Sequence, residues 1–258
     1  MKLIALTGNQ QRHKFFADYL SRHHDLVAVF AEDRFDKNSY GSDYCVLKQH
    51  FNLRTETEKK FFSSYDFPKS TKLIGVPKGK MSEPKVENEI KKIQPEGIAV
   101  LGSGLIKENI IGLCDKFVNM HQGLSPYYRG SGTNFWPFYY EEPEYVGVTI
   151  HYIDIGADSG NITCHGRPEI EPGDSLHDIG CKTIMVSAQL VTNVFNIMEQ
   201  RDIPGIVQWD EGREFKRKDF DHKAVERVCS LFENGLIEKY LVRKNDKKSF
   251  VRLITLEN

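Results

Sequence analysis

The stretch "KLIALTGNQQRHKFFADYL", residues 2–20, decides the fold, because an apolar run ends at a glycine and a helical pattern follows at once. The apolar run is short and nearly continuous, which is typical of a strand buried on both faces. After the glycine, apolar side chains recur at the spacing of one helix face, at Phe15, Phe16, Tyr19 and Leu20. The stretch therefore predicts a buried strand followed directly by a helix.

The same alternation continues toward the middle of the chain. Apolar runs predict further strands at 25–30, 72–77, 97–102 and 116–121. Helices are expected at 82–95, with Ser82 as the N-cap, and at 107–114. Between residues 34 and 71 the sequence is polar and irregular, although 44–51 and 56–65 could each form a short helix.

The second half of the chain keeps to this pattern as far as residue 200. A strand at 146–152 is followed by a loop punctuated with glycines and by another strand. A long helix comes next, capped by Asp174 or Ser175. From about residue 202 the sequence is charged and loosely patterned. We therefore expect a main domain at 1–200 and a C-terminal extension at 201–258 that is partly helical and carries a terminal strand.

Strands and helices that alternate with short links predict an α/β fold. We expect a Rossmann-like, doubly wound and mainly parallel sheet with helices on both faces, followed by the small C-terminal extension. The first loop, "TGNQQRH" at 7–13, has a single glycine, so the dinucleotide pattern G-x-G-x-x-G is absent. Glu32 is the acidic residue nearest the end of the second strand, and it lies two positions beyond that end. These features argue against an NAD-type site.

Composition excludes several classes of protein. The chain has 258 residues, 40% of them hydrophobic, which is enough to bury a full core. Its net charge is -1, so we expect no nucleic-acid partner. No apolar run approaches the roughly 18 residues of a membrane span and no secretory signal is evident, so a cytoplasmic protein without a membrane partner is expected. The five cysteines are scattered without a C-x-x-C pair, which favours reduced thiols, and no metal is expected.

Polar side chains appear where the strand at 116–121 ends. In sheets of this kind, ligands bind outside the carboxyl ends of the strands. Asn119 and His121 should emerge there, and Asp158 follows a neighbouring strand in the loop "IGADSGN". An amide and an imidazole can both donate to an oxyanion, and a carboxylate can orient the imidazole. Because no nucleophilic serine or cysteine stands beside them, this set suits acyl transfer to an external nucleophile.

Two motifs carry a resemblance to a known family. "NMHQGLSPYYRG" at 119–130, followed by "GVTIHYIDIGADSGNI" at 147–162, resembles the folate-dependent formyltransferases, and most of all the sugar N-formyltransferases. The family also includes glycinamide ribonucleotide transformylase and methionyl-tRNA formyltransferase. The resemblance covers roughly residues 1–200 and implies that this part is the catalytic domain. It also implies that Asn119, His121 and Asp158 are the catalytic residues.

The resemblance further implies that N10-formyltetrahydrofolate is the co-substrate. The stretch "LGSGLI" at 101–106 matches the folate-side loop of the family, and the loop before Asp158 would form the other wall. The candidate folate-binding residues are Gly102, Ser103, Gly104, Leu105, Ile106, Ile155 and Gly156. The sequence departs from the family at Ser103, where several members carry an aromatic residue, and at Gln122 and Gly123.

The loop "YYRGSGTNFW" at 127–136 offers candidates for contact with the acceptor. They are Tyr127, Arg129, Gly130, Thr133 and Asn134. Arg129 is either a solvated turn residue or an anion contact. The aromatic residues at 135–140 are expected to pack on a helix, although this loop could also hold a base by stacking.

Two further polar residues have structural interpretations. His151 faces away from Ile150 within its strand and is expected to give structural support. Asp154 precedes a glycine and is expected to hold the loop by local backbone hydrogen bonds.

Among the acceptors of the family, the amine of a nucleotide-linked amino sugar is predicted, for a surface polysaccharide such as lipopolysaccharide. The net charge of -1 gives little attraction for tRNA. Extra sequence at 34–71 and after 202 should flank the carboxyl edge of the sheet, where a larger acceptor needs walls. The alternatives are glycinamide ribonucleotide, a hydroxyornithine-like amine, or a hydrolase that uses water. A homodimer is a possible assembly.

Overall fold

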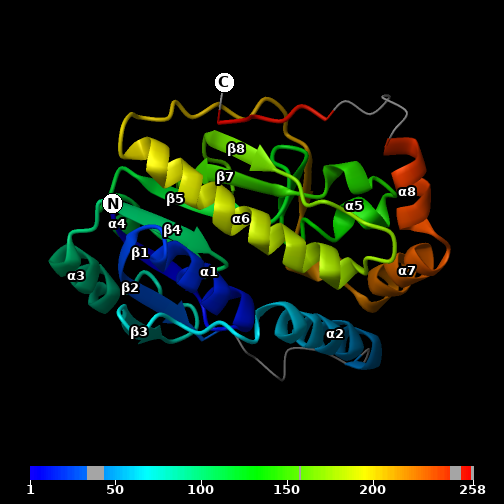
Figure 1. The fold of residues 1–258 in the computed structure, drawn as a ribbon, viewed down its shortest axis with the longest axis horizontal. Coiled ribbons are helices and arrows are strands. Elements are labelled where there is room, and N and C mark those ends of the chain that lie inside the picture. Colours follow the sequence, from blue (N-terminus) through cyan, green and yellow to red (C-terminus); the bar gives the residue numbers. More distant parts are fainter. Residues whose placement is uncertain (34–43, 157, 245–250, 257–258) are drawn as a thin grey trace.

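The computed structural model describes residues 1–33, 44–156, 158–244 and 251–256. Its centre is a 7-stranded sheet in the order β3-β2-β1-β4-β5-β7-β8, with helices on both faces (Figure 1). The parallel strands are β1 (Lys2–Gly8), β2 (Asp25–Glu32), β3 (Lys72–Val76), β4 (Gly97–Leu101) and β5 (Phe117–His121). At one edge, β7 (Val148–Tyr152) and β8 (Ile162–Gly166) pair in antiparallel fashion. The predicted Rossmann-like, mainly parallel α/β sheet is confirmed.

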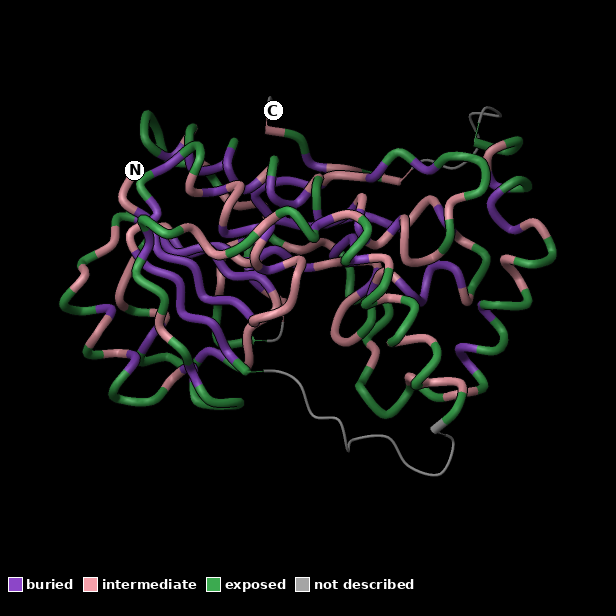
Figure 2. The backbone as a smooth tube through the Cα atoms, turned by 60° about the horizontal axis from the view of Figure 1, so that its bottom comes forward, coloured by how far each residue is buried: buried purple, intermediate pink, exposed green. Residues whose placement is uncertain are grey.

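The apolar run of β1 serves two cores because successive side chains point to opposite faces of the sheet. Leu3 and Ala5 enter the core on one face, and Ile4 and Leu6 enter the core on the other. Both faces of this strand are buried, so polar side chains do not alternate with apolar ones. The apolar run in the sequence is therefore continuous. Figure 2 shows the central strands as buried segments, with the exposed positions on the outer helices.

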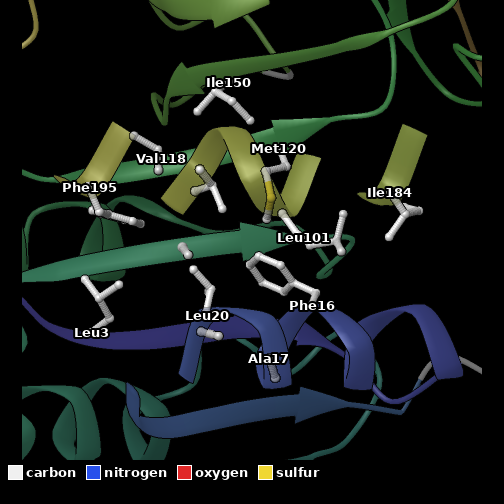
Figure 3. Packing of buried hydrophobic residues seen from close by; sticks show 14 of the residues in the cluster. Leu3, Phe16, Ala17, Leu20, Leu101, Val118, Met120, Ile150, Ile184 and Phe195 are labelled. Carbon is white, nitrogen blue, oxygen red and sulfur yellow. The ribbon is translucent and has the colours of Figure 1, made fainter. Parts of the chain in front are cut away.

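One face of the sheet is covered by α1 (Gln11–Ser21) and α6 (Leu176–Met198). Phe16 and Leu20 of α1 point toward the sheet and toward α6, where Phe195 closes the same core (Figure 3). The side chain of Ser175, one of the two predicted caps, caps α6 by accepting the Asp178 N–H.

The opposite face is covered by α3 (Pro84–Ile93) and α4 (Glu108–Ile111). Glu83, and not Ser82, is the N-cap of α3, so the expected cap is wrong. Pro84 takes the first helical position, which suits a residue without an N–H. The Ser82 hydroxyl instead accepts the Lys107 N–H at 2.8 Å and so ties two loops together.

Residues 44–62 form one helix, α2 (Tyr44–Phe62), where two short ones were expected. No glycine or proline interrupts this segment, so one helix can continue through its polar middle. The helix packs against α1 and α6 and against α7 (His222–Glu233) of the C-terminal extension.

The C-terminal extension shares a third core with the loop after β5. Its elements are β9 (Arg213–Phe215), the 3-10 turn η2 (Arg217–Asp219), α7 and α8 (Leu236–Lys244). They pack against α5 (Trp136–Tyr139) and the turn η1 (Pro143–Tyr145), and β9 pairs with β6 (Tyr128–Gly130). In Figure 1, α2, α5, α7 and α8 gather beyond the carboxyl ends of the parallel strands.

The expected terminal strand is not formed at 251–256. The N–H of His165 in β8 donates to the Ile254 carbonyl at 2.8 Å, but the Ile254 N–H donates to the His165 ring at 2.9 Å. Because a side chain takes the place of a strand carbonyl, the ladder does not continue. Within the described residues, every helix is too short or too polar to span a bilayer.

Candidate active site

Two polar side chains emerge together at the carboxyl end of β5. Asn119 and His121 are alternate residues of the strand and therefore lie on the same face of the sheet. In the antiparallel pair with β7, Asn119 is opposite His151. Residues directly opposite each other point to the same face, so the pleat itself brings His151 beside Asn119.

Asp158 completes this group from the loop after β7. One carboxylate oxygen, Oδ2, lies 3.1 Å from Nδ1 of His121. The other, Oδ1, accepts a hydrogen bond of 3.1 Å from Nδ2 of Asn119. The structure thus brings Asp158 into direct contact with Asn119 and His121, although Asp158 lies far from both in the sequence.

His151 contributes more than the structural support expected of it. Its Nδ1 lies 2.8 Å from the Tyr152 carbonyl, which assigns the proton to Nδ1. The other nitrogen, Nε2, is then free to accept the second N–H of Asn119 at 3.0 Å. The Asn119 amide is therefore held between two acceptors, His151 and Asp158. The sequence offered one signal for this contact, the placement of His151 in a strand next to β5.

The charges at this site are tightly coupled. Burial alone would lower the pKa of His121, but the charge and hydrogen bond of Asp158 and a contact with the Tyr128 carbonyl raise its pKa above the ordinary value. Burial would raise the pKa of Asp158, but the charge and hydrogen bond of His121 hold that pKa far below the usual range. His121 and Asp158 therefore form an ion pair across neutral pH.

The loop that carries Asp158 is held in an unusual backbone conformation. Asp158 has a φ of +54°, which lies in the left-handed region that residues other than glycine rarely adopt. Asp154 accepts the Gly156 N–H at 3.1 Å and the Ser159 hydroxyl at 2.9 Å, which confirms its predicted role. A Cβ on Gly160 would lie 1.8 Å from the Tyr152 carbonyl oxygen, so the loop can close against β7 only with glycine there.

Gly123 and Thr133 pack beside His121. A Cβ on Gly123 would lie 2.6 Å from Cβ of Thr133 and 2.9 Å from Nε2 of His121. The Thr133 hydroxyl donates to the Gln122 carbonyl, and Asn134 accepts the Gly147 N–H at 3.0 Å. These contacts give Thr133 and Asn134 a part in shaping the loop around His121, alongside their predicted contact with the acceptor.

The predicted folate-side residues fall into two groups. Leu105 and Ile155 are both 73% exposed, which is unusual for such large aliphatic side chains. Ile106 is buried in the core under α3 and α4, so its side chain supports the loop from below. Gly102 has a φ of +62°, and the Ser103 hydroxyl donates to the Gly104 carbonyl at 3.0 Å.

Glu32 is a buried carboxylate that the sequence analysis considered only for a dinucleotide site. Its side chain is 1% exposed and accepts the N–H of Gly104 at 2.5 Å and the N–H of Gly79 at 2.7 Å. A Cβ on Gly104 would lie 2.6 Å from the same carboxylate. Glu32 therefore fixes the 102–105 loop at the end of β2.

The loop at 127–136, which carries the predicted contacts with the acceptor, is bound to the C-terminal extension. Arg129 donates to the Glu211 carbonyl, and its Nε is buried with no acceptor among the described residues. Gly130 has a φ of +87°, and a Cβ there would lie 2.3 Å from the Phe215 carbonyl oxygen. Glycine is therefore required at this position for β6 to pair with β9.

Most of the aromatic rings in this loop are buried. Trp136 stacks on Phe215 with ring centroids 4.4 Å apart, and Phe135 and Tyr128 are buried in the same core. This confirms that the aromatic residues pack around α5. The loop at 127–136 was also expected to offer a surface on which a base could stack, and the half-buried Tyr127 remains for this. Its ring centroid lies 5.0 Å from that of Tyr145 and 5.9 Å from that of Trp209.

Comparison with known proteins gives the same family over most of the chain. The Formyl transferase family matches residues 44–195. Methionyl-tRNA formyltransferase of Desulforamulus reducens is 32% identical over 124 residues, which are 47% of this chain and 39% of that protein. The chain thus spans about two fifths of the length of the curated relatives that it matches.

Solved structures share the fold at lower sequence identity. The formyltransferase PseJ from Anoxybacillus kamchatkensis, solved in complex with UDP-4,6-dideoxy-4-formamido-L-AltNAc and tetrahydrofolate, is 21% identical, with a TM-score of 0.53 over 92% of this chain and 96% of that one. A 4-N formyltransferase from Francisella tularensis is 18% identical, with a TM-score of 0.58 over 88% of this chain and 86% of that one. With its family match across more than half of its residues, the chain belongs to the formyl transferase family.

Proposed function

We propose that this protein transfers a formyl group from N10-formyltetrahydrofolate to the amine of a nucleotide-linked amino sugar. The observation that carries the proposal is the contact of Asn119, His121 and Asp158 at the carboxyl end of β5. Two hydrogen-bond donors and a carboxylate meet there without a nucleophilic side chain among them. Such a set suits direct attack by an external amine.

Asn119 and His121 act on the charge that develops on the formyl oxygen. As the amine attacks, this oxygen becomes negative, and preorganised N–H groups stabilise it. In the free site both N–H groups of Asn119 are engaged, with Asp158 and with His151. One of them exchanges its partner for the formyl oxygen, and the raised pKa of His121 keeps a proton on the imidazole for the second hydrogen bond.

Asp158 acts as a fixed negative charge and as the route for the proton. Its pKa is far below the usual range, so the carboxylate stays ionised while it holds His121 protonated. An attacking amine becomes positively charged, which a carboxylate stabilises. The amine proton would then pass, through water held at the Asp158 carboxylate, to N10 of the leaving tetrahydrofolate as the bond between the formyl carbon and N10 breaks.

Exposed aliphatic side chains support a folate site beside this centre. N10-formyltetrahydrofolate would supply the formyl group. Leu105 and Ile155 project from the two loops that match the folate-side walls of the family, and both are largely exposed. Such side chains are suited to cover a flat heterocycle, and Glu32 holds one of the loops in place. The tetrahydrofolate in the PseJ complex agrees with this assignment.

The choice of a sugar nucleotide rests on the acceptor side. Solved structures that align with most of the chain include the formyltransferase PseJ, in complex with a UDP-linked formamido sugar, and a 4-N formyltransferase. The helix α2 and the extension lie beyond the carboxyl edge, where they can form walls for an acceptor larger than glycinamide ribonucleotide (Figure 1). Arg129, which is half-buried in the loop at 127–136, offers a positive charge for a diphosphate.

Methionyl-tRNA is the second candidate acceptor, because the sequence relatives are methionyl-tRNA formyltransferases. Their similarity covers 47% of this chain. The net charge of -1 makes attraction to a tRNA backbone weak, which favours the sugar nucleotide.

An acceptor panel tests the proposal. The enzyme is mixed with N10-formyltetrahydrofolate and, separately, with dTDP-, GDP- or UDP-linked 3-amino and 4-amino deoxysugars, glycinamide ribonucleotide, hydroxyornithine, methionyl-tRNA or no acceptor. Tetrahydrofolate release and the mass of the product are followed, with Asp158→Asn as the inactive control. Formylation of a sugar nucleotide is expected. If methionyl-tRNA or another amine is formylated and no sugar nucleotide is, the assignment of the acceptor is overturned. Release of formate without any acceptor would indicate a hydrolase.

A further inference from the structure

A segment of the C-terminal extension lies directly against the loop that carries Asp158. Ile206 exchanges two backbone hydrogen bonds of 2.8 Å with Ile162 at the start of β8, and Ile203 accepts the Tyr152 hydroxyl at 2.7 Å. A Cβ on Gly205 would lie 2.5 Å from Cβ of Asn161, so the approach is close. In Figure 1 the chain after α6 runs along the outer side of β8. We call residues 203–208 the docking segment.

Gln208, the last residue of the docking segment, reaches the backbone of the Asp158 loop. Its side-chain Nε2 donates to the Asp158 carbonyl at 2.7 Å and to the Gly160 carbonyl at 3.1 Å. Two carbonyl acceptors at one nitrogen assign the orientation of the amide. Gln208 therefore holds the backbone on both sides of Ser159.

These hydrogen bonds matter because the backbone at Asp158 is strained. A residue with a side chain at a φ of +54° costs about 1–2 kcal/mol, and such a conformation persists only where its surroundings fix it. Asp154 fixes the loop from within, through the Gly156 N–H and the Ser159 hydroxyl. Gln208 fixes it from outside the loop, through the Asp158 and Gly160 carbonyls.

We infer that Gln208 is a positioning residue for formyl transfer, which keeps the Asp158 backbone in the one conformation that sets its carboxylate between Asn119 and His121. This inference rests on the proposed function. It makes the extension part of the active site, although none of its side chains contacts Asn119 or His121 among the hydrogen bonds of the described residues. Loss of the Gln208 amide would let the carboxylate drift away from His121.

The inference can be tested in the full chain with three variants. Gln208→Ala removes the amide, and Gln208→Glu keeps the length of the side chain but places an acceptor against two carbonyls. Val207→Ala is the matched control, because the Val207 side chain is 71% exposed in the same segment. We expect turnover to fall about ten- to a hundredfold in both Gln208 variants, the effect of a small misplacement of a reacting group, and to be unchanged in Val207→Ala.

A purely structural role would lower stability without touching the charge on His121. The pKa of His121 is therefore measured by NMR in each variant, with the His121→Asn spectrum as the assignment and His24, which lies between α1 and α6, as the internal reference. If Asp158 moves away, the pKa of His121 falls in Gln208→Ala while that of His24 stays constant. This readout needs neither donor nor acceptor.

A double variant separates the inference from the proposed function. Because Gln208 acts through Asp158, adding Gln208→Ala to Asp158→Asn should cause no further loss of turnover and no further shift at His121. An unchanged His121 titration and normal turnover in Gln208→Ala, beside an inactive Asp158→Asn, would overturn the inference and leave the proposed function intact. An active Asp158→Asn would refute the proposed function, and the His121 titration alone would then decide whether Gln208 positions Asp158.

Discussion

Nδ1 of His121 lies 3.1 Å from Oδ2 of Asp158, in a site where the imidazole is almost completely buried. On the far side of the ring, Nε2 lies 3.2 Å from the Tyr128 carbonyl. Both nitrogens therefore face acceptors, and only the protonated ring can donate to both. The resting state of the site is an imidazolium held by a carboxylate.

The ion pair should make stability depend on pH in a defined window. The folded pKa of His121 is raised above 6.5, so its contribution is complete below that value and is lost as the pH rises through the folded pKa. The folded pKa of Asp158 is lowered from 3.8, so its contribution is present above that value and is lost as the pH falls. The pair therefore contributes most between these two ordinary values.

Asp158→Asn should accordingly lower the free energy of unfolding by about 1–3 kcal/mol near pH 5–6, the range for a hydrogen bond to a charged group. The deficit should shrink at alkaline pH, as the pH rises through the raised pKa of His121, because the neutral imidazole can still donate its hydrogen bond to an asparagine. Urea unfolding near pH 5–6 and at alkaline pH measures the difference. An equal deficit near pH 5–6 and throughout the alkaline range would show that the ion pair does not form.

Alanine substitutions should separate the roles of the three central residues from their effect on the fold. Asn119→Ala, His121→Ala and Asp158→Ala should each reduce formyl transfer by about a hundredfold or more, because each group acts on charge that develops during the reaction. Turnover is measured with the acceptor found in the panel, and circular dichroism checks the fold. A residue whose folded variant turns over normally would have to be removed from the catalytic set.

The sequence predicted the fold because each buried parallel strand corresponds to a continuous run of apolar residues. It also predicted which polar residues meet, since Asn119 and His121 share the period of a strand. It could not predict Gln208, because contact between the docking segment and the Asp158 loop depends on how the extension folds back. The role of Glu32 could not be predicted for a related reason: its contacts with the backbone N–H groups of Gly79 and Gly104 depend on how distant loops meet, which no motif records.

The rate of transfer should depend on pH through two separate groups. The acceptor amine must lose a proton before it attacks, so the rate should fall on the acid side. His121 must keep its proton, so the rate should also fall on the alkaline side, above the ordinary histidine value because its pKa is raised. An acceptor analogue with a less basic amine should shift the acid limb and leave the alkaline limb in place. A rate that stays constant down to about pH 5.5 would contradict the requirement for a free amine. A rate that never falls at alkaline pH would contradict the requirement for a protonated His121.

Gly123→Ala should disturb the position of His121 without any change in charge. The new Cβ would lie 2.9 Å from Nε2 of His121 and 2.6 Å from Cβ of Thr133, so one of the neighbours must move. A displacement of this size can reduce turnover about a hundredfold. Gly180→Ala in α6 is the matched control, since its Cβ would meet nothing within 4 Å, and a helical alanine should add about 0.5–1 kcal/mol of stability. Equal turnover of the two variants would show that the space beside His121 is not critical.

Glu32→Ala should act on folate binding more than on the chemical step. The carboxylate accepts the N–H groups of Gly79 and Gly104, and its removal leaves two partly buried donors without this acceptor, at a cost of up to about 1–3 kcal/mol each if they stay unpaired. The loop can avoid this cost by moving toward water, which would carry Leu105 away from the proposed folate wall. We therefore expect a higher KM for N10-formyltetrahydrofolate and a smaller change in kcat, because the hydrogen bonds of Glu32 to Gly79 and Gly104 hold the folate-side loop. Asp33→Ala is the control, since Asp33 is exposed and accepts from Asn9 at 2.7 Å just outside the strand. If Glu32→Ala lowers kcat and leaves the KM unchanged, the 102–105 loop serves the chemical step, and the folate wall lies elsewhere.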